Sequence, residues 1–128
     1  MTRNLIAPAL LLALFSQSPL PIRPAAALPD FDALQEQGAS RTRAANLARM
    51  QAERLNGGLE RYRPEACMFE RGGGACFVEA SERGLLFRFR GGPPGWQQLG
   101  LAANRDTEIL IAPDGRSVLE VVYNGDPR

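Results

Sequence analysis

The sequence contains no histidine and no lysine, so arginine is the only basic residue type in its 128 positions. Without histidine there is no imidazole to act as a base near neutral pH or to bind a metal ion. Without lysine there is no side-chain amine for a Schiff base or a desolvated nucleophile. Arginine replaces neither, because it stays protonated at any ordinary pH. We therefore expect a chain without a cofactor and without a metal site.

Long apolar runs are also scarce, and the clearest one lies near the N-terminus. A positively charged start is followed by an apolar run from Leu5 to Phe15, and Ala25-Ala26-Ala27 comes before Leu28. This order is typical of a cleavable secretory signal peptide. An uncleaved membrane anchor is the alternative, but a spanning helix needs about 20 apolar residues. We predict a signal peptide at residues 1–27, a lead-in at 28–39 and a single domain at 40–128.

Charge gives no indication of a nucleic-acid partner. Removal of residues 1–27 takes away Arg3 and Arg23, which reduces the 15 basic residues to 13 against 14 acidic ones. A net charge near −1 does not favour binding to nucleic acid or to an anionic membrane surface. We expect no nucleic-acid partner and no stable membrane insertion after cleavage.

Cysteine is limited to Cys67 and Cys76. An even number of cysteines after a signal peptide indicates a disulfide. The glycine-rich stretch between them predicts a hairpin, with Cys67–Glu70 and Gly74–Ala80 as strands and the two cysteines opposite each other. Free thiols and a redox pair are the alternatives. A redox pair favours the C-x-x-C spacing, which this chain lacks.

The remaining pattern predicts one helix followed by strands. Ser40 is a suitable N-cap for a helix over Arg41–Asn56, with a stripe formed by Ala44, Leu47, Ala48, Gln51 and Leu55. Strands are predicted over Leu59–Arg63, in the cysteine hairpin, over Leu85–Arg90, over Glu108–Ala112 and over Ser117–Tyr123, with a turn at Pro113-Asp114-Gly115. The tail from Asn124 to Arg128 is expected to fray. The fold class is α+β, with one N-terminal helix packed on an antiparallel meander of about five strands.

Two groups of residues are candidates for interaction. The stretch from Gly91 to Trp96 could form a presented loop, with Pro93 and Pro94 stiffening it and Trp96 as an aromatic anchor. Alternatively, Trp96 folds back over an open end of the sheet. Arg88 and Arg90 could belong to a polar binding surface, or form ordinary cross-strand charge pairs with Glu79 and Glu120.

Asp106 and Glu108 are the candidates for chemistry. Two carboxylates at this spacing could act as general acid and base, or bind a hard cation. The alternative is a solvated strand entrance without a function. Arg71-Gly72-Gly73-Gly74 lacks the lysine and the spacing of a phosphate-binding loop, so we interpret it as a turn.

Four stretches of the sequence resemble small secreted proteins of marine cyanobacteria. They are LNGGL from Leu55, EACM from Glu65, GGPPGWQ from Gly91 and VLEVVYNG from Val118. The resemblance implies an organism class and a compartment, which is the periplasm, the exterior or the thylakoid lumen, but no function. From the residues we expect a non-enzymatic exported domain that binds a protein partner. The alternatives are a small-ligand binding protein or a minor carboxylate-dependent hydrolase, and a structural accessory.

Overall fold

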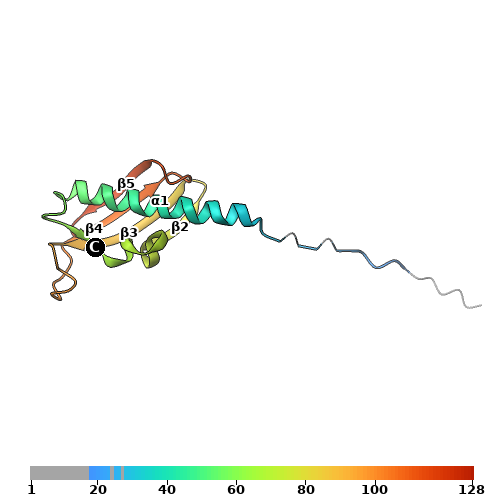
Figure 1. Cartoon of the computed structure of the whole chain (residues 1–128), viewed down its shortest axis with the longest axis horizontal. Coiled ribbons are helices and arrows are strands. Elements are labelled where there is room, and N and C mark those ends of the chain that lie inside the picture. Colours follow the sequence, from blue (N-terminus) through green and yellow to red (C-terminus); the bar gives the residue numbers. More distant parts are fainter. Residues whose placement is uncertain (1–17, 24, 27) are drawn as a thin grey trace, which may run out of the picture.

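A computed structural model describes residues 18–23, 25–26 and 28–128. Most of the predicted signal peptide lies outside these residues, so its cleavage stays a prediction. Within the part of the chain that the structure describes, no helix combines the length and the apolar character needed to cross a bilayer. The described chain forms one long helix followed by an antiparallel sheet of five strands, which confirms the predicted α+β class (Figure 1).

Helix α1 spans Phe31–Leu55 and is longer than predicted. It begins at the N-cap Asp30, whose side chain accepts a hydrogen bond from the backbone N–H of Asp32 at 3.1 Å. Ser40, the predicted N-cap, instead lies inside the helix and donates to Glu36 Oε1 at 3.0 Å. The predicted start was wrong because Asp30 performs the capping role that the sequence also offers at Ser40.

The buried face of α1 is made of alanine. Its buried apolar residues are Ala44, Ala45, Ala48 and Ala52. Leu55, which the predicted stripe placed on this face, is 44% exposed. The face of α1 that packs on the sheet is therefore rotated away from Leu55 and toward the alanines. Small residues on this face let the helix axis lie close to the sheet.

The predicted cysteine hairpin was wrong. Cys67 lies in the 3₁₀ helix η1 (Ala66–Phe69), and Cys76 ends a second one, η2 (Arg71–Cys76). Gly73 in η2 has φ +83°, and a Cβ at that position would lie 2.8 Å from the ring of Phe87. The glycine run thus lets the backbone lie directly against the core, where a side chain would not fit. A hairpin turn at the surface would not need glycine for this reason.

The sheet consists of β1 (Arg63–Pro64), β2 (Phe77–Ser81), β3 (Gly84–Gly92), β4 (Arg105–Ile111) and β5 (Val118–Gly125). Its order is β1-β3-β4-β5, and β2 also pairs with β3, so β3 to β5 form the predicted meander. Only the end of the predicted Leu59–Arg63 strand pairs in the sheet, as part of β1.

The core lies between α1 and one face of the sheet. Strand β3 alternates as predicted, with Leu85, Phe87 and Phe89 buried and with Arg88 and Arg90 exposed. Ile109 and Ile111 on β4 complete this face. The opposite face, which we call the outer face, carries the charged residues of these strands.

One end of the two layers is closed. There the amide of Asn56, the C-cap of α1, exchanges hydrogen bonds of 3.0 and 3.1 Å with Asn124 on β5. Thr107 on β4 also donates to Asn124, at 2.8 Å. Tyr62 is buried close by in the core, and burial raises its pKa to about 12. We call this region the closed end.

The C-terminal tail does not fray as predicted. Strand β5 continues to Gly125, and Arg128 then lies against the outer face. Its guanidinium stacks 3.7 Å from the ring centroid of Tyr123 and donates to Glu108 at 3.0 Å. A cation–π contact and an ion pair therefore hold residues that the sequence pattern left without a partner.

Candidate functional site

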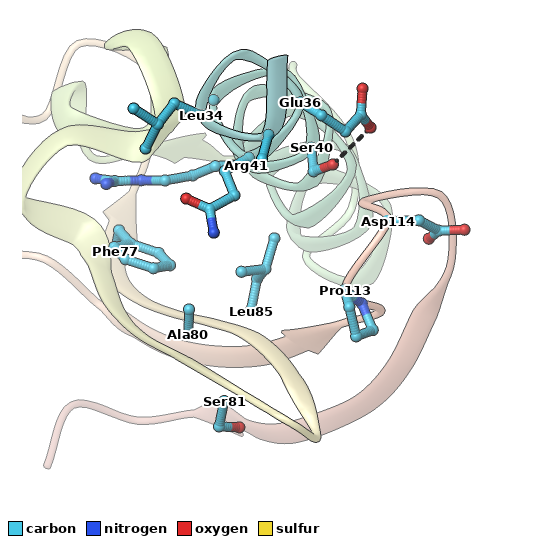
Figure 2. A pocket seen from close by; sticks show the side chains of 13 residues that line it. Leu34, Glu36, Ser40, Arg41, Phe77, Ala80, Ser81, Leu85, Pro113 and Asp114 are labelled. Carbon is cyan, nitrogen blue, oxygen red and sulfur yellow. Dashed lines mark hydrogen bonds between the residues drawn. The ribbon is translucent and has the colours of Figure 1, made fainter. Parts of the chain in front are cut away.

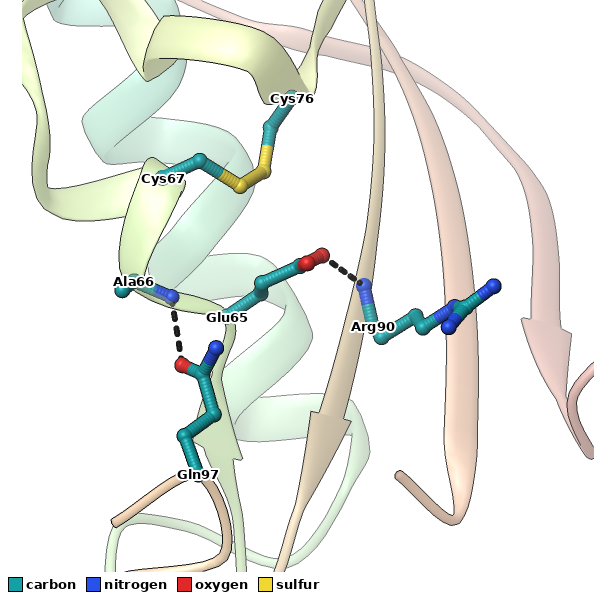
Figure 3. The surroundings of a disulfide bond; sticks show 6 residues. All are labelled: Glu65, Ala66, Cys67, Cys76, Arg90 and Gln97. Atoms are coloured by element: carbon teal, nitrogen blue, oxygen red, sulfur yellow. Dashed lines mark hydrogen bonds between the residues drawn. A yellow bond between two sulfur atoms is a disulfide. The ribbon is translucent and has the colours of Figure 1, made fainter. Parts of the chain in front are cut away.

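The predicted disulfide between Cys67 and Cys76 is present, with the Cα atoms 5.7 Å apart. Figure 3 shows Glu65 beside it, accepting a hydrogen bond from the backbone N–H of Arg90 at 3.0 Å. Glu65 and the two sulfur atoms form a group within 4.8 Å that could hold a metal ion. Because each sulfur is bonded to the other, neither offers the thiolate that metal binding needs. The group is a structural clip that joins η1, η2 and β3.

Trp96 is buried at the closed end rather than presented. Its ring packs over Gly92, and its indole Nε1 donates to the carbonyl of Arg63 at 3.0 Å. It is 8% exposed, which agrees with the alternative in which the ring folds back over an end of the sheet. Pro93 and Pro94 lead into this turn, and Leu99 and Leu101 beyond it are 70% and 50% exposed. The sequence analysis named Trp96 as the exposed anchor of this stretch, whereas the exposed apolar side chains are those of Leu99 and Leu101.

Arg88 and Arg90 lie on the outer face. The guanidinium of Arg88 is 3.2 Å from the Glu108 carboxylate and forms a cross-strand ion pair, since the two residues face each other in the β3–β4 register. Arg90 has no ion-pair partner among the described residues. For Arg88 the structure therefore agrees with the charge-pair alternative, although with Glu108 rather than the expected Glu79 or Glu120.

Asp106 and Glu108 are neighbours on the outer face, and both are largely buried by their surroundings. The hydrogen bond from Arg88, assisted by that from Arg128, holds the pKa of Glu108 below its ordinary value. A general acid needs the opposite shift, toward a carboxyl that stays protonated near neutral pH. A shallow hollow of about 180 Å³ gathers Glu108 with Glu79 and Glu120 but not with Asp106. The geometry gives no support to the predicted acid–base pair.

The main candidate cavity among the described residues lies at the end of the domain opposite Trp96. It has a volume of about 830 Å³ and opens between the N-terminal half of α1 and the ends of the strands. We call it the mouth cavity. Figure 2 shows the helix above and the strands below it. Most of its lining is apolar and comes from α1, β2, β3 and the β4–β5 turn: Ala33, Leu34, Phe77, Ala80, Leu85 and Pro113.

The β4–β5 turn sets the inner limit of this cavity. Gly115 has φ +75°, and a Cβ there would lie 2.2 Å from the carbonyl oxygen of Ser40. The side chain of Arg43 donates to the carbonyl of Asp114 at 3.0 and 3.2 Å. The helix therefore rests on the turn at Ser40, and the turns before that residue extend past the sheet. Phe31 and Leu34 on this part of α1 are 69% and 50% exposed.

The polar residues of the mouth cavity are partly neutralised. Arg43 donates to Glu36 at 2.7 Å, and Ser40 donates to the same oxygen. These bonds lower the pKa of Glu36, the contribution of Arg43 being the largest. Arg41 differs, because its Nε donates to the carbonyl of Gly72 at 2.9 Å and its guanidinium carbon lies 3.9 Å from the ring centroid of Phe77. The cavity thus has an apolar floor and one positively charged wall.

The sequence prediction did not find the mouth cavity. Its lining comes from four separate elements, and the predicted helix began only at Arg41. One signal was available: Phe31 and Leu34 are apolar residues three positions apart, followed by Gly38 and Ala39 without a helix-breaking proline. Read as a helical face, they predict an apolar surface upstream of Ser40.

The fold defines a two-layer α+β domain, clipped by one disulfide and with a cavity between its layers. No protein-family model matches the chain, and neither do any curated proteins or solved structures. The function must therefore be inferred from the site.

Proposed function

We propose that this protein is an exported, non-enzymatic binding domain that holds a small apolar ligand in the mouth cavity. The observation that carries the proposal is the cavity of about 830 Å³ with its apolar floor. Ligand pockets usually enclose about 300–1,000 Å³ and combine an apolar lining with a few polar groups. The mouth cavity has the size and the lining of such a pocket.

Export is supported by three features. Residues 1–27 have the order of a signal peptide, and Cys67 and Cys76 form a disulfide, which is stable in oxidising compartments. The resemblance to secreted cyanobacterial proteins suggests the periplasm, the exterior or the thylakoid lumen. A binding role fits this setting better than catalysis, because the chain has no histidine and no lysine.

Titration with the neutral fluorescent probe N-phenyl-1-naphthylamine tests the proposal. We expect the wild-type protein to enhance and saturate its fluorescence. Ala80→Trp places an indole in the cavity, because Ala80 lies on its floor in Figure 2, and should abolish binding. Ala102→Trp is the matched control, since Ala102 is exposed and is not part of the cavity. Equal binding by both variants would remove the cavity as the site.

A protein partner is the second candidate function, and the exposed leucines favour it. Leu99 and Leu101 follow Trp96 near a cavity of about 420 Å³ that Pro94 and Phe69 help to line. Leu99→Ser should then abolish partner capture with the fold intact, whereas Trp96→Ala should unfold the closed end. If capture is unchanged in Leu99→Ser, this surface is not the interface.

A further inference from the structure

Arg41 stands out among the charged residues around the mouth cavity. Within residues 28–128 the ion pairs involve Arg43, Arg49, Arg83, Arg88, Arg105 and Arg128. Arg41 takes part in none of them, although it is only partly exposed. Its one side-chain hydrogen bond uses Nε, so both terminal nitrogens are without a protein acceptor among these residues.

The guanidinium of Arg41 is nevertheless held in place. The Gly72 carbonyl fixes Nε from one side, and the ring of Phe77 lies under the guanidinium plane. A Cβ at Gly72 would lie 3.0 Å from Nε, and φ at that residue is +68°. The glycine therefore makes room for the arginine. An arginine fixed in this way loses less conformational entropy when it binds an anion.

The acidic groups of the cavity do not compete for this guanidinium. Glu36 is engaged by Arg43 and Ser40, and the Asp114 carboxylate accepts from the backbone N–H of Arg116 at 3.0 Å. Figure 2 shows both carboxylates on the side opposite Phe77, pointing away from the cavity. The positive charge on the Phe77 side is therefore not balanced from within the cavity.

We infer that the ligand is an anionic amphiphile, with an apolar tail in the mouth cavity and one carboxylate or phosphate head group on the terminal nitrogens of Arg41. This inference rests on the proposed function and adds the ligand class. The planar guanidinium offers two parallel donors that match such a head group. The tail then extends over Leu85 and Ala80, which line the floor.

Calorimetric titration with ligands of one tail length tests the head-group preference. Decanoate, decanol and decyltrimethylammonium are compared below their micellar concentrations, and decyl phosphate distinguishes the two anionic head groups. We expect decanoate or decyl phosphate to bind at least about tenfold more tightly than decanol, the strength of a charge-assisted hydrogen bond. Decyltrimethylammonium should bind most weakly.

Arg41→Gln should reduce the affinity for the anionic ligand to that for decanol and leave decanol unchanged. Arg54→Gln, on the same helix but outside the cavity, should change neither. If Arg41→Gln does not fold, the NMR signals of the arginine side-chain Nε–H groups in the wild-type protein show whether the head group binds at Arg41. A shift of the Arg41 signal by decanoate, with the Arg54 signal fixed, supports the inference, and the reverse pattern overturns it.

Two failures can be told apart. If decanol binds as tightly as the anionic ligands, or only the neutral fluorescent probe binds, the inference about Arg41 is overturned and the mouth cavity remains the site. If neither the neutral probe nor any amphiphile binds, the proposed function itself fails.

Discussion

The two halves of α1 meet the sheet in opposite ways. From Ala44 to Ala52 the residues facing the sheet are alanines with almost no exposed surface, and the layers are in close contact. From Phe31 to Ala39 every residue is exposed, including the large side chains of Phe31 and Leu34. Small side chains lie where the layers touch, and large apolar ones lie where nothing in the described chain covers them. The C-terminal half, which we call the packed half, therefore holds the helix on the sheet, and the N-terminal half borders the mouth cavity.

The largest effect should come from enlarging a residue of the packed half. Ala48 is fully buried, so Ala48→Leu should destabilise the protein by about 3 kcal/mol, at the upper end of overpacking costs. Ala33→Leu is the matched change at the mouth cavity and should alter stability by less than about 0.5 kcal/mol. Urea denaturation measures both. Similar losses in the two variants would show that the halves of α1 are packed alike.

Removal of the disulfide should have the next largest effect. The cysteines are 9 positions apart, so the double variant Cys67→Ala/Cys76→Ala should lose about 2–3 kcal/mol from loop-closure entropy. It should also weaken decanoate binding, because η2 carries Gly72, which fixes Arg41 at the cavity. Denaturation with and without a reductant measures the loss. The double variant should not respond to the reductant, and a wild type equally insensitive to it would contradict the disulfide.

The polar contact at the closed end should contribute less. Asn124→Ala removes the exchange with Asn56 and the acceptor of Thr107, and we expect a loss of about 1–2 kcal/mol. Asn104→Ala is the control, because Asn104 is exposed and its side chain makes no hydrogen bond in the described chain. Thermal unfolding of both variants measures the difference. The closed end does not depend on this contact if both variants melt alike.

The sequence predicted features that depend on neighbouring residues. Leu85, Phe87 and Phe89 alternate with polar residues, and Pro113-Asp114-Gly115 has the composition of a turn, so β3 and the β4–β5 hairpin could be recognised. The disulfide followed from the number of cysteines. These predictions held because each depends on a local pattern or a simple count.

The predictions that failed depended on tertiary contacts. Ser40 is a suitable N-cap in isolation, but here Asp30 caps the helix and the β4–β5 turn packs against Ser40. The glycines after Arg71 have the composition of a hairpin turn, yet they approach Phe87 and Arg41, residues distant in the sequence. The mouth cavity depends on contacts of this kind, so the spacing of Phe31 and Leu34 could indicate an apolar helix face but not the cavity that it borders.

The smallest effect concerns the ion pair between Glu36 and Arg43 at the mouth cavity. The hydrogen bond from Arg43 lowers the pKa of Glu36, so the folded state favours the charged carboxylate. A lowered pKa adds stability above the pKa of the unfolded chain, and this stability is lost as pH falls through the folded value. Between roughly pH 5 and pH 3 the wild type should therefore lose slightly more thermal stability than Glu36→Gln.

Glu60→Gln, which removes a glutamate outside the ion pairs of the described chain, should follow the wild type. Because Glu36 is exposed, about 150 mM salt should reduce the difference in stability loss between the wild type and Glu36→Gln. Salt would screen an ion pair much less if it were buried as deeply as the alanines of the packed half.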